Sequence, residues 1–298
     1  MSKLPESYPS LVIEGTPEEL EAILPTLADA GTLGTEEVST RRWRRQKVYF
    51  PPGTDVGPLC GELARHFPFL HIGDVETVPA QDWLRSWKKD LAGFAVGEGF
   101  YIVPSWEAVP ETERIVLRID PERAFGTGSH DTTRLCLELV ELLARPGTKT
   151  IDAGTGTGVL AMAAASLGSQ PVYAIEADPG AASCARDNVI RNGLEGRVEI
   201  ENTSMADASP PPAHLVTANV HDTVLRKNLA RLSSWVLPGG SLILSGLLLD
   251  QIQPLVQSLP RSFYLRQHRT AGEWGALWIG RETPRPVSTS GAADCAAG

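Results

Sequence analysis

Features that would mark several other classes of protein are missing from this chain of 298 residues. No apolar run approaches the roughly 18 residues that a membrane-spanning helix requires. The opening residues, MSKLPESYPS, contain no apolar segment of the kind found in secretory signals. The net charge at pH 7 is −9, whereas a protein that binds nucleic acid needs a basic face. We therefore expect no membrane attachment and no direct nucleic-acid partner.

Cysteine is scarce and scattered. The four cysteines lie far apart, without a C-x-x-C pair and without neighbouring histidines, at Cys60, Cys136, Cys184 and Cys295. Zinc sites and disulfide frameworks both need closely grouped or regularly spaced cysteines. The pattern indicates reduced thiols in a cytoplasmic protein that holds no metal.

The composition is that of a globular protein, with 42% hydrophobic and 21% charged residues. A chain of this length is expected to form two domains, and the pattern changes near residue 80. We predict a small α+β domain over 1–79, a linker over 80–105, a larger domain over 106–282 and a disordered tail over 283–298. The tail contains Pro, Ser, Gly and Ala without an apolar period.

The first domain has the pattern strand, helix, strand, strand, helix, strand. A strand at 11–13 is followed by a helix that Thr16-Pro17 opens and that has Leu20, Ile23, Leu24 and Leu27 on one face. Further strands are expected at 36–39, 46–50 and 75–78, with a second helix over 56–67. This order is typical of a ferredoxin-like unit.

The linker is predicted to contain a helix and the start of a hairpin. Trp83 and Trp87 are four residues apart, which places them on one helix face, where they indicate an interdomain core. The segments 101–106 and 114–119 are expected to pair as a β-hairpin, with residues 109–112 in the turn.

Helices and strands alternate after residue 130, and this pattern predicts a doubly wound α/β sheet with an antiparallel end. The expected elements are a helix at 131–144, a strand at 149–153, a helix at 158–167, a strand at 172–176, a helix at 180–192, strands at 197–201 and 214–219, a helix at 222–235, a strand at 241–246, a helix at 250–259, and strands near 262–268 and 274–280.

The most informative segment is the strand and turn KTIDAGTGTG, residues 149–158. Gly154, Gly156 and Gly158 let the backbone approach a ligand closely, and the following helix presents its N-terminus to the site. The spacing differs from the G-x-G-x-x-G of dinucleotide-binding folds. Asp152 precedes the loop, where a carboxylate repels a pyrophosphate and suits a cationic ligand. Both differences favour S-adenosylmethionine, which carries a positive amine and sulfonium.

Two further candidates follow from the rule that ligands bind outside the carboxyl ends of the strands. Glu176 ends the predicted strand at 172–176, where an acid can accept hydrogen bonds from the ribose hydroxyls of an adenosine ligand. The alternative for an acid in this region is helix capping, which better suits Asp178 ahead of Pro179. Asn219 ends another strand, where it can cap a helix or hold a nitrogen nucleophile.

At this point the chain resembles a known family. The segment Ala124–Thr133, with the sequence AFGTGSHDTT, is similar to the signature of the PrmA family, the bacterial methyltransferases of ribosomal protein L11. Further motifs appear in the same order and cover the chain short of its tail: Asp82-Trp83 with Trp87, residues 102–106, the glycine loop, Asn188 with residues 191–193, Ala218-Asn219, residues 238–240, Ser245-Gly246 and residues 272–274.

The resemblance implies a ferredoxin-like domain that recognises the ribosomal protein, a linker, and a Rossmann-like class I methyltransferase domain. It also implies cofactor contacts from Thr133, Gly154, Glu176 and Asn219, with Phe125, Gly126 and Thr127 in a loop that covers the cofactor. We add Asp152 and Gly156 to these candidates from the glycine loop itself. The family commonly has Asp at the position of Glu176, and it continues after Asn219 with small or apolar residues where this chain has His221 and Asp222.

The leading hypothesis is an S-adenosylmethionine-dependent N-methyltransferase, expected to be a monomer, that acts on lysine ε-amines and the N-terminal α-amine of ribosomal protein L11. Asn219 is the candidate catalytic residue, because it can orient the neutral amine. His130 and His221 are the nearest titratable groups, and His130 better suits the structural role of pinning the 125–133 loop. The alternatives are a methyltransferase of the same fold with another protein substrate, a nucleotide-dependent oxidoreductase, and a binding protein without cofactor.

Overall fold

The structure is a computed structural model that describes residues 7–32, 34–37, 44–79, 92–120, 128 and 130–283. The chain divides into two compact units, Met1–Leu91 and Ala92–Gly298. The predicted Trp83–Trp87 helix, the Phe125–Thr127 loop and the tail after Thr283 lie outside the described residues. Within the described ranges, no helix is long and apolar enough to cross a membrane.

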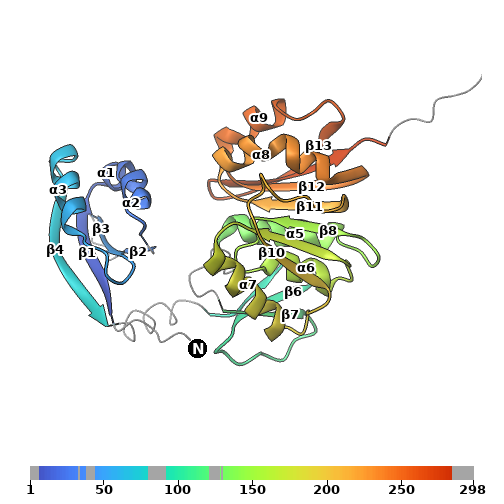
Figure 1. The fold of residues 1–298 in the computed structure, drawn as a ribbon, viewed down its shortest axis with the longest axis horizontal. Helices are drawn as coiled ribbons and strands as arrows, with labels where there is room; N and C mark the ends of the chain where they lie inside the picture. Colours follow the sequence, from blue (N-terminus) through green and yellow to red (C-terminus); the bar gives the residue numbers. More distant parts are fainter. Residues whose placement is uncertain are drawn as a thin grey trace, which may run out of the picture. The chain divides into compact units, whose positions relative to one another are not determined.

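The first unit is a four-stranded antiparallel sheet with helices (Figure 1). Its elements are β1 (Ser7–Gly15), α1 (Pro17–Ala22), α2 (Leu24–Asp29), β2 (Gly34–Glu37), β3 (Arg44–Tyr49), α3 (Gly57–His66) and β4 (His71–Pro79). The strands lie in the order β2-β3-β1-β4, and each neighbouring pair is antiparallel. The β-α-β-β-α-β pattern predicted from the sequence is confirmed.

The first helix differs from the prediction, because it is broken into α1 and α2 at Ile23. Pro25 accounts for the break, since proline has no amide hydrogen and its ring clashes with the preceding turn of a continuous helix. Leu20, Ile23 and Leu27 are buried in the core of the unit, as expected. Leu24 is 47% exposed, so its place on the predicted apolar face is wrong.

The second unit contains a three-stranded sheet followed by a seven-stranded one. The small sheet has β5 (Phe94–Val96), β6 (Phe100–Pro104) and β7 (Ile115–Ile119). The large sheet and its helices are α5 (Asp131–Leu143), β8 (Thr150–Ala153), α6 (Val159–Ser166), β9 (Val172–Glu176), α7 (Pro179–Arg191), β10 (Val198–Asn202), β11 (Ala213–Asn219), α8 (Asp222–Trp235), β12 (Val236–Leu248), α9 (Leu249–Gln257), β13 (Phe263–Ala271) and β14 (Trp274–Arg281).

The seven strands lie in the order β10-β9-β8-β11-β12-β14-β13. Strands β10, β9, β8, β11 and β12 are parallel to one another, and β14 is antiparallel to both β12 and β13. The predicted doubly wound sheet with an antiparallel end is therefore confirmed. The strand order reverses direction between β8 and β11, which is the position where open α/β sheets bind ligands.

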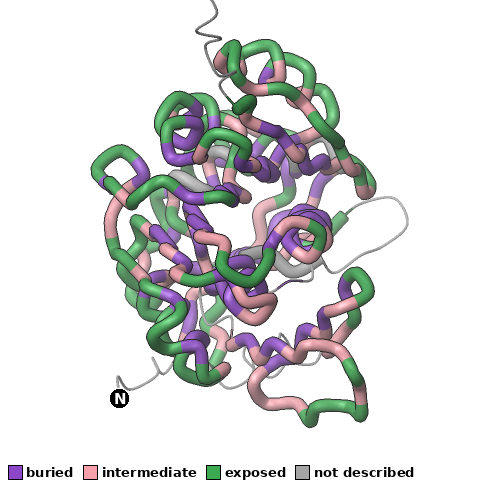
Figure 2. The backbone as a smooth tube through the Cα atoms, turned by 90° about the vertical axis from the view of Figure 1, so that its right-hand side faces the viewer, coloured by how far each residue is buried: buried purple, intermediate pink, exposed green. Residues whose placement is uncertain are grey.

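The two faces of the large sheet bury separate cores. Leu215 and Ile243 face the core that contains α5 and α6, whereas their neighbours Val216 and Leu242 face the core that contains α8 and α9. This alternation is the period of two expected of a strand that is covered on both faces. Figure 2 shows buried residues along the inner segments of the chain and exposed residues on many of the turns.

The segments 101–106 and 114–119 pair as predicted, but they do not form the predicted hairpin. Strand β6 pairs with β7 in parallel, and the hairpin is formed instead by β5 and β6, with Gly97 at φ 55° in their turn. Residues 105–114 run back along the pair and let β7 start beside the first residue of β6. The sequence of this return segment resembles a turn, which led to the prediction of a hairpin. A turn-like sequence alone does not show whether the two strands that it connects are parallel or antiparallel. The range predicted as linker, 80–105, also includes β5 and β6.

Candidate active site

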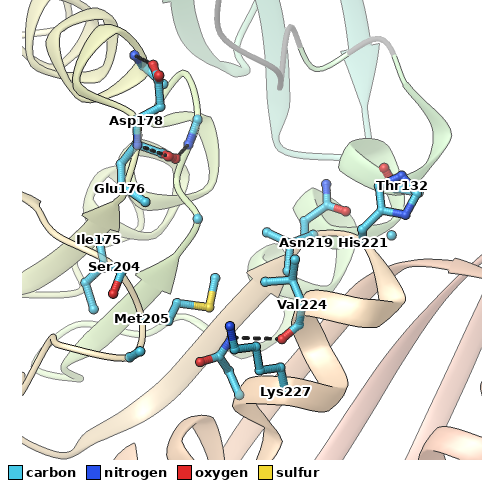
Figure 3. Close-up of a pocket in the computed structure, with 18 of the residues that line it drawn as sticks. Thr132, Ile175, Glu176, Asp178, Ser204, Met205, Asn219, His221, Val224 and Lys227 are labelled. Carbon is cyan, nitrogen blue, oxygen red and sulfur yellow. Dashed lines mark hydrogen bonds between the residues drawn. The ribbon is translucent and has the colours of Figure 1, made fainter. Parts of the chain in front are cut away.

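A cavity of about 900 Å³ lies at the carboxyl ends of β8, β9 and β11. Three candidates lie at the cavity, each at the end of a different strand: Gly154 follows β8, Glu176 ends β9 and Asn219 ends β11. Figure 3 shows Glu176 and Asn219 in the cavity lining. The described residues that line it are His130, Thr132, Gly154, Gly156, Ile175, Glu176, Ala177, Asp178, Ala181, Thr203, Ser204, Met205, Ala206, Asn219, Val220, His221, Val224, Lys227, Asn228, Gly246 and Trp274.

The glycine loop has a backbone that other residues adopt only with strain. Gly154, Gly156 and Gly158 have φ values of 73°, 55° and 84°. A Cβ atom on Gly154 would lie 2.5 Å from Cγ1 of Val220, so a side chain there would collide with the cavity wall. A Cβ atom on Gly158 would meet Cβ of Ala185 on α7 at 3.4 Å, which is ordinary contact. Gly154 is therefore required by close approach at the cavity, and Gly158 by its backbone conformation.

Glu176 joins the end of β9 to the glycine loop. Its Oε2 accepts a hydrogen bond from the backbone N–H of Gly156 at 2.9 Å, and its Oε1 accepts one from the N–H of Asp178 at 3.0 Å. Each carboxylate oxygen can accept further hydrogen bonds. The carboxylate is thus held in a fixed orientation at the cavity and keeps acceptor positions for a ligand.

The capping role assigned to Asp178 is confirmed. Its side chain is the N-cap of α7 and accepts from the N–H of Ala181 at 2.7 Å. The two acids of this segment therefore have different roles. Asp178 satisfies the helix, whereas Glu176 orients the loop.

Asp152 lies beneath the glycine loop and does not line the cavity. It is 1% exposed, and its two oxygens accept from the hydroxyls of Thr155 and Thr217, each at 2.6 Å. Burial raises the pKa of this carboxyl, and the hydrogen bonds from the two threonines oppose the shift. The direct ligand contact expected of Asp152 is not what this geometry favours, because its acceptors are directed at the loop and at β11.

Asn219 lines the cavity, and Thr133 lies behind it. The Nδ2 of Asn219 donates to the Thr133 hydroxyl at 3.3 Å. The Oδ1 of Asn219 is buried and has no hydrogen-bond partner within the part of the chain that the structure describes. A buried acceptor without a partner is costly, so this oxygen suits a donor that arrives with a ligand. Thr133 is 1% exposed, and the neighbouring Thr132 reaches the cavity instead.

His130 and His221 both line the cavity but are held differently. The Nδ1 of His130 accepts from the N–H of Thr132 at 3.3 Å and caps α5, and its ring contacts Trp274 edge-on at 5.0 Å. These contacts support the structural role predicted for His130. His221 is the residue before α8, is exposed, and makes no side-chain capping bond.

Several lining residues were not predicted as site residues. Residues 203–206 directly follow β10, so the strand-end rule that found Glu176 could have found them as well. Gly246 and Trp274 belong to motifs that carried the family resemblance without an assigned role. Lys227 and Asn228 on α8 had no signal in the sequence, because two polar residues on a helix usually face solvent. The structure describes no group of three or more His, Cys, Asp or Glu residues that could hold a metal ion within its ranges.

Known proteins resemble this chain in sequence and in structure. A family model described as ribosomal protein L11 methyltransferase (PrmA) matches residues 21–282. The protein named ribosomal protein L11 methyltransferase from Paraburkholderia xenovorans is 39% identical over 296 residues, covering 91% of this chain and 97% of the relative. One of the same name from Pelobacter propionicus is 36% identical over 271 residues, covering 84% and 85%. The solved structure of a ribosomal protein L11 methylase from Lactobacillus delbrueckii subsp. bulgaricus matches with a TM-score of 0.60 and 29% identity, covering 64% of this chain and 99% of that one.

The strand order, the glycine loop after β8, and the acid and amide at the ends of β9 and β11 on either side of it accompany this structural match. Together they define the class, a Rossmann-like methyltransferase. Because the family model spans most of the chain and relatives match over nearly their whole length, the chain belongs to the ribosomal protein L11 methyltransferase family.

Proposed function

We propose that this chain transfers methyl groups from S-adenosylmethionine to lysine ε-amines, and to the N-terminal α-amine, of ribosomal protein L11. The observation that carries the proposal is the meeting of Gly154, Glu176 and Asn219 at one cavity in a chain of this family. The family supplies the reaction class. In this arrangement Glu176 can accept hydrogen bonds from a diol, and Asn219 offers an amide oxygen as a further acceptor. Gly154 lets the backbone approach a ligand closely.

The residues present fit S-adenosylmethionine. Gly154 leaves the cavity wall beside Val220 open, because any side chain there would collide with Val220. Glu176 keeps acceptor positions that two ribose hydroxyls can use. We assign Glu176 to the ribose and Gly154 with Gly156 to the loop that borders the cofactor. Asp152 acts through Thr155 on the shape of that loop. Thr133 acts through Asn219, and Phe125, Gly126 and Thr127 stay predicted cofactor contacts.

The cofactor, when bound, supplies a methyl group that its sulfonium already activates. The chain then has to orient a neutral amine and keep water away from it. A lysine in water has a pKa of about 10.4 and must lose its proton before it can attack. The apolar lining from Ile175, Met205 and Val224 favours the neutral amine, because burial disfavours a charge. Asn219 Oδ1 can accept a hydrogen bond from that amine and fix the direction of its lone pair.

The first unit, which includes the predicted domain 1–79, is proposed to recognise the ribosomal protein. Its sheet and helices form a separate core, so it can present a surface without disturbing the methyltransferase fold. The chain has a net charge of −9, which suits a basic protein partner. We retain the predictions of a cytoplasmic monomer without a nucleic-acid partner.

A changed protein substrate is the second candidate. His221 lines the cavity at a position where the family has a small or apolar residue. His221 therefore gives the cavity a larger and more polar side chain at that position. The exposed Lys227, on α8, lines the cavity as well. Comparing methyl transfer to purified L11 with transfer to a whole ribosomal protein fraction separates the two substrates.

Cofactor choice is tested by thermal shifts with S-adenosylmethionine, NAD and NADP. The proposal expects stabilisation by S-adenosylmethionine alone, because a ligand that binds the folded state raises the unfolding temperature. Stabilisation by either dinucleotide and none by S-adenosylmethionine would support an oxidoreductase instead.

A further inference from the structure

Two asparagines, Asn188 on α7 and Asn192 at its C-cap, bind the open edge of β7 and the residue that follows this strand. Strand β7 is at the edge of its sheet, since it pairs only with β6 among the described strands. Asn192 accepts from the N–H of Arg118 and donates to its C=O, both at 2.8 Å. Asn188 accepts from the N–H of Asp120 at 2.8 Å and donates to its C=O at 3.1 Å. Each side-chain amide thus pairs both backbone groups of one residue, as a neighbouring strand would.

Asn188 makes two contacts that Asn192 does not. Its Nδ2 also donates to the backbone C=O of Thr157 at 3.0 Å, inside the glycine loop. Its Oδ1 also accepts from Nη1 of Arg191 at 2.7 Å. The residue is 0% exposed, so all of these bonds are shielded from water. Asn188 therefore joins the glycine loop to the end of β7, whereas Asn192 contacts β7 and α7 but no backbone group of the loop.

The bond to Thr157 is a second anchor of the glycine loop, beside the one from Glu176. The N–H of Gly156 is held by the Glu176 carboxylate, and the C=O of Thr157 is held by Asn188. Gly156, which lines the cavity, directly precedes Thr157 in the chain. The start of the loop is anchored separately, where the Thr155 hydroxyl donates to Asp152. The Asn188 bond therefore holds the part of the loop that follows Gly156.

We propose that Asn188 is a positioning residue for the cofactor site, which it shapes through the Thr157 carbonyl without touching the ligand. This inference rests on the proposed use of the cavity for S-adenosylmethionine. If both asparagines only stabilised the fold, substitutions of Asn188 and Asn192 should have equal effects on cofactor affinity. The test is therefore whether the two substitutions differ in their effect on cofactor affinity.

The experiment compares Asn188→Asp with Asn192→Asp in the full chain. In each variant a carboxylate oxygen replaces the amide nitrogen and faces two backbone carbonyls, those of Asp120 and Thr157 for Asn188 and those of Arg118 and Asn188 for Asn192. Both substitutions should lower the unfolding temperature, because each buries an unfavourable contact. Calorimetric titration with S-adenosylmethionine should show a dissociation constant raised about tenfold for Asn188→Asp and within about twofold of the original for Asn192→Asp.

Steady-state kinetics provide a second readout. Asn188→Asp should raise the KM for the cofactor and leave the KM for the protein substrate unchanged, with kcat largely recovered at saturating cofactor. Asn188→Ser, which removes the bonds without adding charge, serves if the aspartate variant does not fold, and it should show the same pattern. Equal cofactor affinities for the Asn188 and Asn192 variants would overturn the inference. No cofactor binding by the unaltered chain would overturn the proposed function instead.

Discussion

Replacing Glu176 by alanine should weaken S-adenosylmethionine binding by about 1.5–3 kcal/mol, the typical contribution of hydrogen bonds to a charged group. The carboxylate is held at the cavity by the backbone N–H groups of Gly156 and Asp178, so its remaining acceptor positions are already oriented for ribose hydroxyls. The expected loss corresponds to a dissociation constant higher by about 10- to 150-fold. Glu176→Asp should retain most of the affinity, because it keeps the carboxylate and is only one methylene shorter.

The assay is calorimetric titration of each variant with S-adenosylmethionine. Glu199→Gln is the matched control, since it removes one negative charge from the exposed side of the neighbouring strand β10, away from the cavity lining. The control should bind as the original chain does. An unchanged affinity for Glu176→Ala, in a variant that still folds, would reduce Glu176 to a residue that only braces the loop.

Three further predictions concern the first unit, the acceptor amide and the buried acid. A shortened chain that starts at Val78 should bind S-adenosylmethionine with nearly full affinity but lose methylation of intact L11, and normal turnover would refute the division of labour between the units. Asn219→Ala should lower turnover by about a hundredfold, which is more than it raises the dissociation constant of the cofactor, because a misaligned reacting pair costs about that much in rate. Asn219→Asp should move the rising limb of the pH–rate profile to higher pH, since a carboxylate favours the ammonium form. Asp152→Asn should remove one contribution to the pH dependence of the free energy of unfolding. Burial raises the pKa of Asp152, so the folded chain holds this proton more tightly, and the contribution of this group to stability should fall as pH rises above about 3.9 in the original chain and be absent from the variant.

Strand ends were the most predictable part of this protein. Glu176 and Asn219 could be located because parallel strands bring their carboxyl ends to one edge of the sheet, and both line the cavity. The same rule could not tell which way a side chain turns at the strand end. The side chain of Asp152, in β8, is buried beneath the loop, where it accepts from Thr155. Thr133 was a candidate from the family resemblance and not from this rule, since it lies on α5, and it is buried behind Asn219.

Strand direction and cross-chain contacts were not predictable in this way. The parallel pairing of β6 with β7 depends on how residues 105–114 return, and local pattern carries no information on that path. The hydrogen bond from Asn188 to Thr157 joins residues that are distant in sequence. No periodic pattern in a single sequence indicates such a contact. Asn188 was visible only as part of a motif that carried the family resemblance.

The most direct test of the central claim is methyl transfer to purified ribosomal protein L11. The full chain would be incubated with L11 and S-adenosylmethionine carrying a labelled methyl group, and the label located by peptide mass spectrometry. The account predicts label on lysine side chains and on the N-terminal amine of L11, and little or none when Asn219→Ala replaces the original chain. Bound cofactor with no label on L11, while another protein in a ribosomal fraction is methylated, would contradict it.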